Sequence, residues 1–180
     1  MIITVEKAKQ LVNLEGWTDE KIEMKLKAVE QTIRAYTNNS FQNRGYRKVA
    51  DIAGDLFVTD DHPFKVGDTV QVSESTLNAG IYTIIAADDT AFETAEDVAD
   101  EAEVLVTRID YPADVVACAL NLMEWEVNMR GKVGIQSETL SRHSVTYVNM
   151  DGNNQSGSSN IMGYPASLLG CLKAYRKARF

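Results

Sequence analysis

The sequence predicts an α+β protein in which a small β-barrel is inserted into a helical body. Apolar residues recur at three- and four-residue steps near both ends of the chain, which is the period of an α-helix. Between residues 46 and 110 the period changes to two, which is the period of a strand. The charge changes there too, since residues 46–110 contain 4 Lys and Arg against 15 Asp and Glu, a net charge of −11. We therefore expect a body formed by residues 1–45 and 111–180, a small bundle of three to four helices, and a separate acidic β module formed by residues 46–110.

Two helices are expected before the insert. Thr4 can cap a first short helix with four apolar residues on one face: Val5, Ala8, Leu11 and Val12. Thr18 can cap a second helix across residues 19–36, whose apolar face is Ile22, Leu26, Val29, Ile33 and Tyr36. Residues 37–40 should end this helix, because Thr, Asn and Ser side chains readily bond their own backbone.

Five short strands are expected in the insert, separated by turn residues such as Gly54, Gly67 and Asn78. These strands are residues 48–52, 55–58, 69–73, 80–86 and 103–109. Residues 64–72, followed by residues 79–84, resemble the small SH3-like barrels. That resemblance implies a compact antiparallel barrel between the second and third main helices.

After the insert, Pro112 favours the start of a long helix. Its expected apolar face is Val115, Val116, Ala119, Leu120, Met123 and Val127, and Gly131 should end it. Residues 134–148 alternate between apolar and polar and predict a β-hairpin or extended arm, and residues 149–160 predict a polar loop. Pro165 can start a last short helix whose apolar residues are Leu168, Leu169 and Leu172.

The last helix leads into a basic and aromatic tail. Its residues are Lys173, Tyr175, Arg176, Lys177, Arg179 and Phe180. A buried anchor that carries exposed cations is suited to docking on another molecule. The same cations would also be favourably placed at the negative end of the helix dipole, and charge alone does not separate these two interpretations.

We find no pattern typical of an enzyme or a metal site. His143 lies beside Ser141 and Ser144, but no nucleophile-elbow turn accompanies them. Cys118 and Cys171 lack the paired spacing of zinc or redox motifs and are expected to be small core residues. The chain is therefore predicted to be no enzyme and to use no cofactor or metal. No segment resembles a signal peptide or a membrane span, so we expect the protein to be made in a cytosol without membrane association.

The order of elements resembles the head-tail connector proteins of long-tailed bacteriophages and prophages, also called head completion or adaptor proteins. Three stretches carry the likeness: residues 4–37, the arm from Gly134 to Tyr147, and residues 163–180 with Gly163-Tyr164-Pro165 at their start. The arm is similar to the family's "Ser-Glu-Ser … Tyr-Ser-Val" pattern, although His143 stands where a tyrosine is often found. The acidic insert is a departure, because the smallest members have a loop in its place.

The resemblance implies a structural virion protein at the head-tail interface of the capsid vertex, assembled in the bacterial host cytoplasm. It would join the portal protein, form a ring of about twelve subunits, and support a tail-side connector or stopper protein, with DNA only passing through the channel. The tail residues named above would dock on the portal. The arm would contact a neighbouring subunit or face the channel through Ile135, Gln136, Ser137, Glu138, Leu140, Val145 and Tyr147.

Two other function classes stay open at this point. A carbohydrate- or peptide-binding β-barrel module would use aromatic residues of the insert to line a groove: Phe57, Phe64, Tyr82 and Phe92. A small hydrolase would use Asp and Glu residues of the insert, but no spaced acid-base pair stands out among them.

Overall fold

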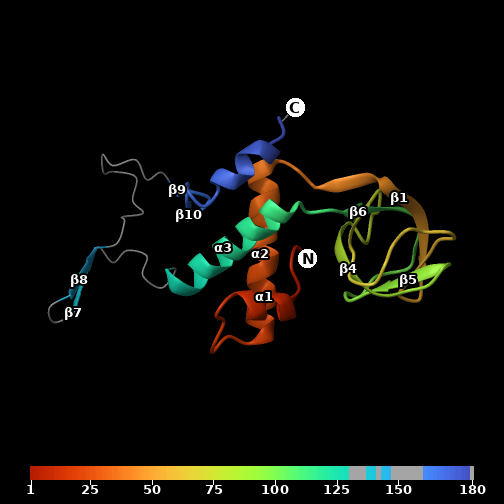
Figure 1. Cartoon of the computed structure of the whole chain (residues 1–180). Coiled ribbons are helices and arrows are strands. Elements are labelled where there is room, and N and C mark those ends of the chain that lie inside the picture. Colours follow the sequence, from red (N-terminus) through yellow and green to blue (C-terminus); the bar gives the residue numbers. More distant parts are fainter. Residues whose placement is uncertain (130–136, 141–142, 147–159, 179–180) are drawn as a thin grey trace. The chain divides into compact units, whose positions relative to one another are not determined.

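A computed structural model describes residues 1–129, 137–140, 143–146 and 160–178 (Figure 1). The chain is mixed helix and strand and divides into two compact units. The barrel unit consists of Met1 and Ser40–Tyr111, and the helical unit consists of Ile2–Asn39 and Pro112–Phe180. The α+β class predicted from the two periodicities is confirmed. The barrel unit begins before the predicted insert, because its first strand already starts at Gln42.

The barrel unit is a closed barrel of six antiparallel strands. In sequence these are β1 (Gln42–Ala53), β2 (Leu56–Val58), β3 (Thr69–Ser73), β4 (Gly80–Ala87), β5 (Ala91–Thr94) and β6 (Glu101–Ile109). Their order around the barrel is β1-β2-β5-β4-β3-β6, and β6 closes it by pairing with β1. Closure leaves no free edge strand.

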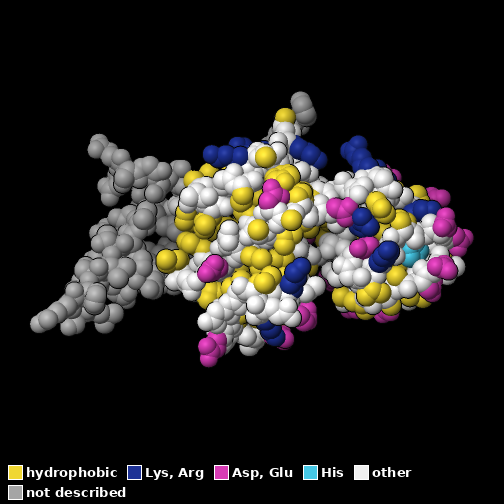
Figure 2. Space-filling view, in the orientation of Figure 1, with side chains coloured by type: hydrophobic (Ala, Val, Ile, Leu, Met, Phe, Trp, Pro, Cys, Tyr) yellow, Lys and Arg dark blue, Asp and Glu magenta, His cyan; other side chains and the backbone are white. Residues whose placement is uncertain are grey.

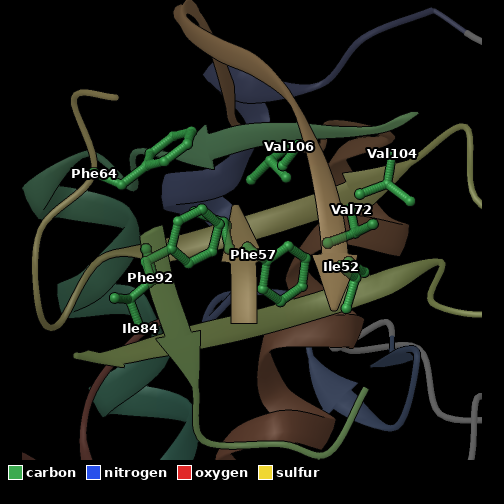
Figure 3. Packing of buried hydrophobic residues seen from close by; sticks show 10 residues of the cluster. Ile52, Phe57, Phe64, Val72, Ile84, Phe92, Val104 and Val106 are labelled. Carbon is green, nitrogen blue, oxygen red and sulfur yellow. The ribbon is translucent and has the colours of Figure 1, made fainter. Parts of the chain in front are cut away.

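Three aromatic rings pack together inside the barrel. Phe57 on β2 stacks on Phe92 on β5, with ring centroids 4.7 Å apart and planes 6° from parallel. Phe64 meets Phe92 edge-on at 5.3 Å. Figure 3 shows these rings among aliphatic side chains from the other strands, all of them buried. The barrel therefore has its own hydrophobic core.

Strand β5 was not among the predicted strands. It has only four residues, and Asp88, Asp89 and Thr90 directly before it indicate a turn. It forms because Phe92 pairs with Phe57 on β2 and with Ala87 on β4. The two neighbouring strands therefore hold these four residues in a strand. The prediction of five strands is therefore corrected to six.

The helical unit begins with α1 (Val5–Leu11) and α2 (Asp19–Thr37). As predicted, Thr4 and Thr18 cap them, accepting hydrogen bonds from the backbone N–H groups of Lys7 and Lys21. The predicted face of α2 is buried at Ile22, Leu26, Val29 and Ile33. On α1 the prediction was wrong at Leu11, which is exposed because the helix ends there and the chain turns its next residue, Val12, inward.

Helix α3 (Ala113–Asn128) packs against α2, but its buried stripe is rotated from the predicted one. The stripe runs through Val115, Cys118, Ala119, Leu122, Met123 and Glu126, whereas Val116, Leu120 and Val127 are only partly buried. The misplacement has a physical cause. A glutamate in an apolar helix is ordinarily expected to face water, whereas Glu126 is held inside by partners far away in the sequence.

The C-terminal part of the helical unit differs from the predicted last helix. Strand β9 (Asn160–Ile161) pairs with β10 (Tyr164–Pro165), so Pro165 lies in a strand and starts no helix. A 3-10 helix, η2 (Gly170–Tyr175), follows. Gly170 is a weak helix former, and the three-residue period of η2 puts Leu169 and Leu172 on one buried face. Cys171 lies off this face and is exposed, which corrects its predicted place in the core.

A second two-stranded sheet lies in the segment predicted as a β-hairpin or arm. Strand β7 (Ser137–Leu140) pairs antiparallel with β8 (His143–Thr146), with Ser137 opposite Thr146 and Leu140 opposite His143. This register confirms the hairpin. The predicted polar loop 149–160 lies outside the described residues, apart from Asn160.

Candidate functional site

The basic C-terminal segment, residues 173–178 of the described chain, is anchored to the helical unit by the residues before it. Leu169 and Leu172 are fully buried, and η2 packs on both α2 and α3. Tyr164 is also buried, and its hydroxyl donates to Glu126 Oε1 at 2.7 Å. Lys25 Nζ lies 3.1 Å from the other oxygen of the same carboxylate. These buried contacts hold the start of the basic C-terminal segment in place.

The backbone of the basic C-terminal segment is fastened to the C-terminal end of α2. The Lys177 N–H donates to the carbonyl of Thr37 at 2.8 Å. The amide Nδ2 groups of Asn38 and Asn39 donate to the carbonyls of Ala178 and Tyr175, at 3.0 and 3.3 Å. These asparagines were expected to bond their own backbone. Instead, their side-chain amides bond carbonyls of the tail, and the Lys177 N–H satisfies a carbonyl that the end of α2 would otherwise leave without a partner.

Three cations of this segment point to solvent. Lys173, Arg176 and Lys177 are exposed, and no carboxylate among the described residues forms an ion pair with them. The Arg176 guanidinium lies 5.2 Å from the centre of the Tyr36 ring. Figure 2 shows Lys and Arg side chains at the surface near the C-terminus. The dipole interpretation concerned the predicted last α-helix, and the structure has the 3-10 helix η2 in its place. The three cations are exposed at the surface.

Tyr175 contributes to this surface in a different way from the cations. Its hydroxyl donates to both carboxylate oxygens of Asp114, each at 2.7 Å, and this hydrogen bond raises the pKa of Tyr175. Asp114 lies in the first turn of α3. The tyrosine therefore positions the segment, whereas the three cations stay exposed.

The other predicted site residues fall in two groups. Ser137, Glu138, Leu140 and Val145 lie on the paired strands β7 and β8. Ile135, Gln136, Tyr147, Arg179 and Phe180 lie outside the described residues. The structure thus brings the three cations and Tyr175 together on one segment.

Two carboxylates of the barrel unit, those of Asp88 and Glu101, accept hydrogen bonds from nearby turns. Asp88 accepts hydrogen bonds from the N–H groups of Thr90 and Ala91, and these bonds keep its pKa low. Glu101 accepts from the Ser75 hydroxyl at 2.6 Å and from the Thr76 N–H at 2.6 Å. Carboxylates used in this way fix turns.

Glu101 makes a pH-dependent contribution to the stability of the barrel unit. Its hydrogen bonds to the β3–β4 loop lower its pKa from 4.5 to about 2. This stabilisation is present above pH 4.5 and is lost as the pH falls from 4.5 toward 2. We expect Glu101→Gln to reduce the loss of barrel stability between pH 5 and pH 3, measured by urea unfolding and circular dichroism. As a control, Glu103→Gln at an exposed position should keep the wild-type pH dependence. The same change of barrel stability with pH in all three proteins would contradict this assignment.

The barrel aromatics named for a binding module pack in or against the barrel core. Phe57, Phe64 and Phe92 are buried in the core, and the Tyr82 hydroxyl donates to the Asn78 carbonyl at 3.0 Å. His62 stacks on Phe64 at 5.6 Å and lies edge-on to Phe92 at 5.5 Å, so it is part of the same packing. These rings are therefore structural.

Several residues important to the basic C-terminal segment were missed in the sequence. Asp114, Glu126, Asn38 and Asn39 hold the segment, yet each resembles an ordinary surface residue when read alone. Their partners lie between 38 and 140 residues away in the chain. The one indication of these contacts in the sequence was that α2 and α3 end in polar residues, since helix termini require hydrogen-bond partners.

Within the described ranges no cluster of His, Cys, Asp and Glu could hold a metal ion. The helices of those ranges are also too short or too polar to span a bilayer. Neither a scan against protein-family models nor a search of curated proteins found a match. We therefore infer the function from the sequence pattern and the geometry.

Proposed function

We propose that this chain is a structural virion protein that joins the portal ring of a tailed phage capsid to the tail or to a stopper protein. Its working form would be a ring of about twelve subunits, as the likeness to head-tail connectors implies. The observation that carries the proposal is the basic C-terminal segment, in which three exposed cations sit on a backbone already fixed to α2. The partner would be an acidic surface of the portal protein.

Fixing the segment in advance favours binding. Ordering a flexible tail on a partner opposes association, and this cost is smaller when the backbone is held beforehand. The Arg176 guanidinium can pair with a carboxylate through two parallel hydrogen bonds, whereas Lys173 and Lys177 act as point charges. Such charges raise the association rate and set the orientation of the partner.

A ring requires each subunit to use two different surfaces. We assign the hairpin β7–β8 to a neighbouring subunit or to the channel, as the resemblance implies. The acidic barrel unit would repel phosphate groups and thus keep passing DNA from binding. We also propose that the barrel is of the SH3-like type and that α1, α2, α3 and η2 form a small helical bundle. The short antiparallel strands and the packing of α1, α3 and η2 on α2 support these two assignments.

Charge reversal of the basic C-terminal segment tests this function. The triple variant Lys173→Glu, Arg176→Glu and Lys177→Glu is expected to weaken binding to the portal protein of the same genome by about tenfold or more. The expected loss is largest at low salt, because salt screens exposed charges. Binding of the purified proteins can be measured by biolayer interferometry at two salt concentrations.

A matched control reverses Lys7, Arg44 and Lys65, which are exposed and lie elsewhere on the chain. This control has the same net charge as the first variant and should bind like wild type. Equal loss in both variants would assign the effect to net charge. Binding of the wild-type segment to duplex DNA, with no binding to the portal, would favour a nucleic-acid site instead.

A further inference from the structure

Two cysteine thiols meet at a single carbonyl oxygen in the helical unit. The Sγ atom of Cys118 on α3 lies 3.2 Å from the Leu168 carbonyl oxygen, and the Sγ atom of Cys171 on η2 lies 3.5 Å from the same atom. The two residues are far apart in the sequence and share no zinc or redox motif. Their shared acceptor brings the thiols next to each other.

The two thiols differ in access and in acidity. Cys118 is buried and Cys171 is exposed. Burial raises the pKa of Cys118, and contact with Cys171 and the charge of Asp114 raise it further. Since the thiolate is the reactive form, Cys118 is a poor first nucleophile. A reagent from solution would therefore react first with Cys171.

We propose that Cys118 and Cys171 are an oxidation site that a low-molecular-weight disulfide such as oxidised glutathione converts to an intramolecular disulfide. The Cys171 thiolate attacks the reagent, a mixed disulfide forms, and one glutathione thiolate leaves. The Cys118 thiol then attacks the Cys171 sulfur, and its proton passes to the second glutathione sulfur as that group leaves as a thiol. Two protein thiols are oxidised and one glutathione disulfide is reduced to two glutathione thiols.

The cross-link would join α3 to η2 two residues before Lys173, the first cation of the basic C-terminal segment. It would hold the base of that segment even when η2 opens locally. This consequence rests on the proposed function, because a virion that leaves the reducing host cytosol enters conditions where disulfides persist. The connector would assemble with free thiols and be locked afterwards.

The oxidation site can be tested on the full chain without any partner. After incubation with oxidised glutathione, intact mass spectrometry should show wild type lighter by two hydrogen atoms and free of glutathione. Peptide mapping should identify the Cys118–Cys171 link. Cys118→Ala should keep one glutathione on Cys171, and Cys171→Ser should react far more slowly. A stable glutathione adduct on wild type, or no reaction, would overturn the proposal.

The locking effect has its own readout. Hydrogen exchange of the peptide that contains η2 should slow by about tenfold in the oxidised chain, since a cross-link limits local opening. Unchanged exchange in a chain shown to be cross-linked would overturn the locking role. Binding to the portal is measured separately on reduced protein. A disulfide that forms in a chain unable to bind the portal would therefore refute only the proposed function.

Discussion

Replacing Glu126 with alanine is expected to destabilise the helical unit by about 3 kcal/mol. Glu126 is 4% exposed, and its carboxylate accepts the Tyr164 hydroxyl at 2.7 Å, with Lys25 Nζ at 3.1 Å. Removing it leaves a buried hydroxyl without this acceptor and a partly buried ammonium without this counter-charge. Because Tyr164 precedes η2, the basic C-terminal segment should also lose its anchor.

Tryptophan fluorescence during urea unfolding can measure the stability of the helical unit in this variant. The chain has two tryptophans, Trp17 and Trp125, and both belong to the helical unit. Trp125 also lies against Tyr164, with ring centroids 5.3 Å apart. Glu124→Ala, an exposed position on the same helix, should change the free energy of unfolding by less than about 0.5 kcal/mol. Similar stability of both variants would show that the buried carboxylate does not hold the segment.

Replacing Phe57 with alanine is expected to destabilise the barrel unit by about 4 kcal/mol. Its side chain is fully buried and stacks on Phe92 at 4.7 Å, so the change removes a ring and leaves a cavity in the core. A domain of this size is rarely stable by more than about 10 kcal/mol. The variant should therefore populate the unfolded barrel measurably.

Hydrogen exchange measured for individual peptides shows whether the loss of stability is confined to the barrel unit. Peptides that cover β2, β4 and β5 should exchange much faster in Phe57→Ala than in wild type. Leu56→Ala is the matched control, because Leu56 neighbours Phe57 on β2 but is 42% exposed. Equal exchange rates in the two variants would contradict the assignment of Phe57 to the centre of the barrel core.

The sequence was sufficient to predict elements whose pattern is long and local. Helix α2 has a threonine cap and an unbroken apolar stripe, so its bounds and its buried face could be predicted almost to the residue. The exposed Lys173, Arg176 and Lys177 were predictable for a similar reason, because clustered cations remain in water.

Features that depend on distant partners could not be predicted. Strand β5 is ordered by its neighbours, and the burial of Glu126 depends on Tyr164 and Lys25. The fastening of the tail depends on Asn38 and Asn39, whose local preference is to bond their own backbone. In each case a tertiary contact outweighed the local signal.

The central claim is that this chain adds a ring to the portal. The most direct measurement is negative-stain electron microscopy with light scattering of the chain mixed with the portal protein of its own genome. We predict an added ring on the portal with wild type, and a strongly reduced yield with the triple charge-reversal variant of Lys173, Arg176 and Lys177. A portal that gains no density and no mass with the wild-type chain would contradict the connector function.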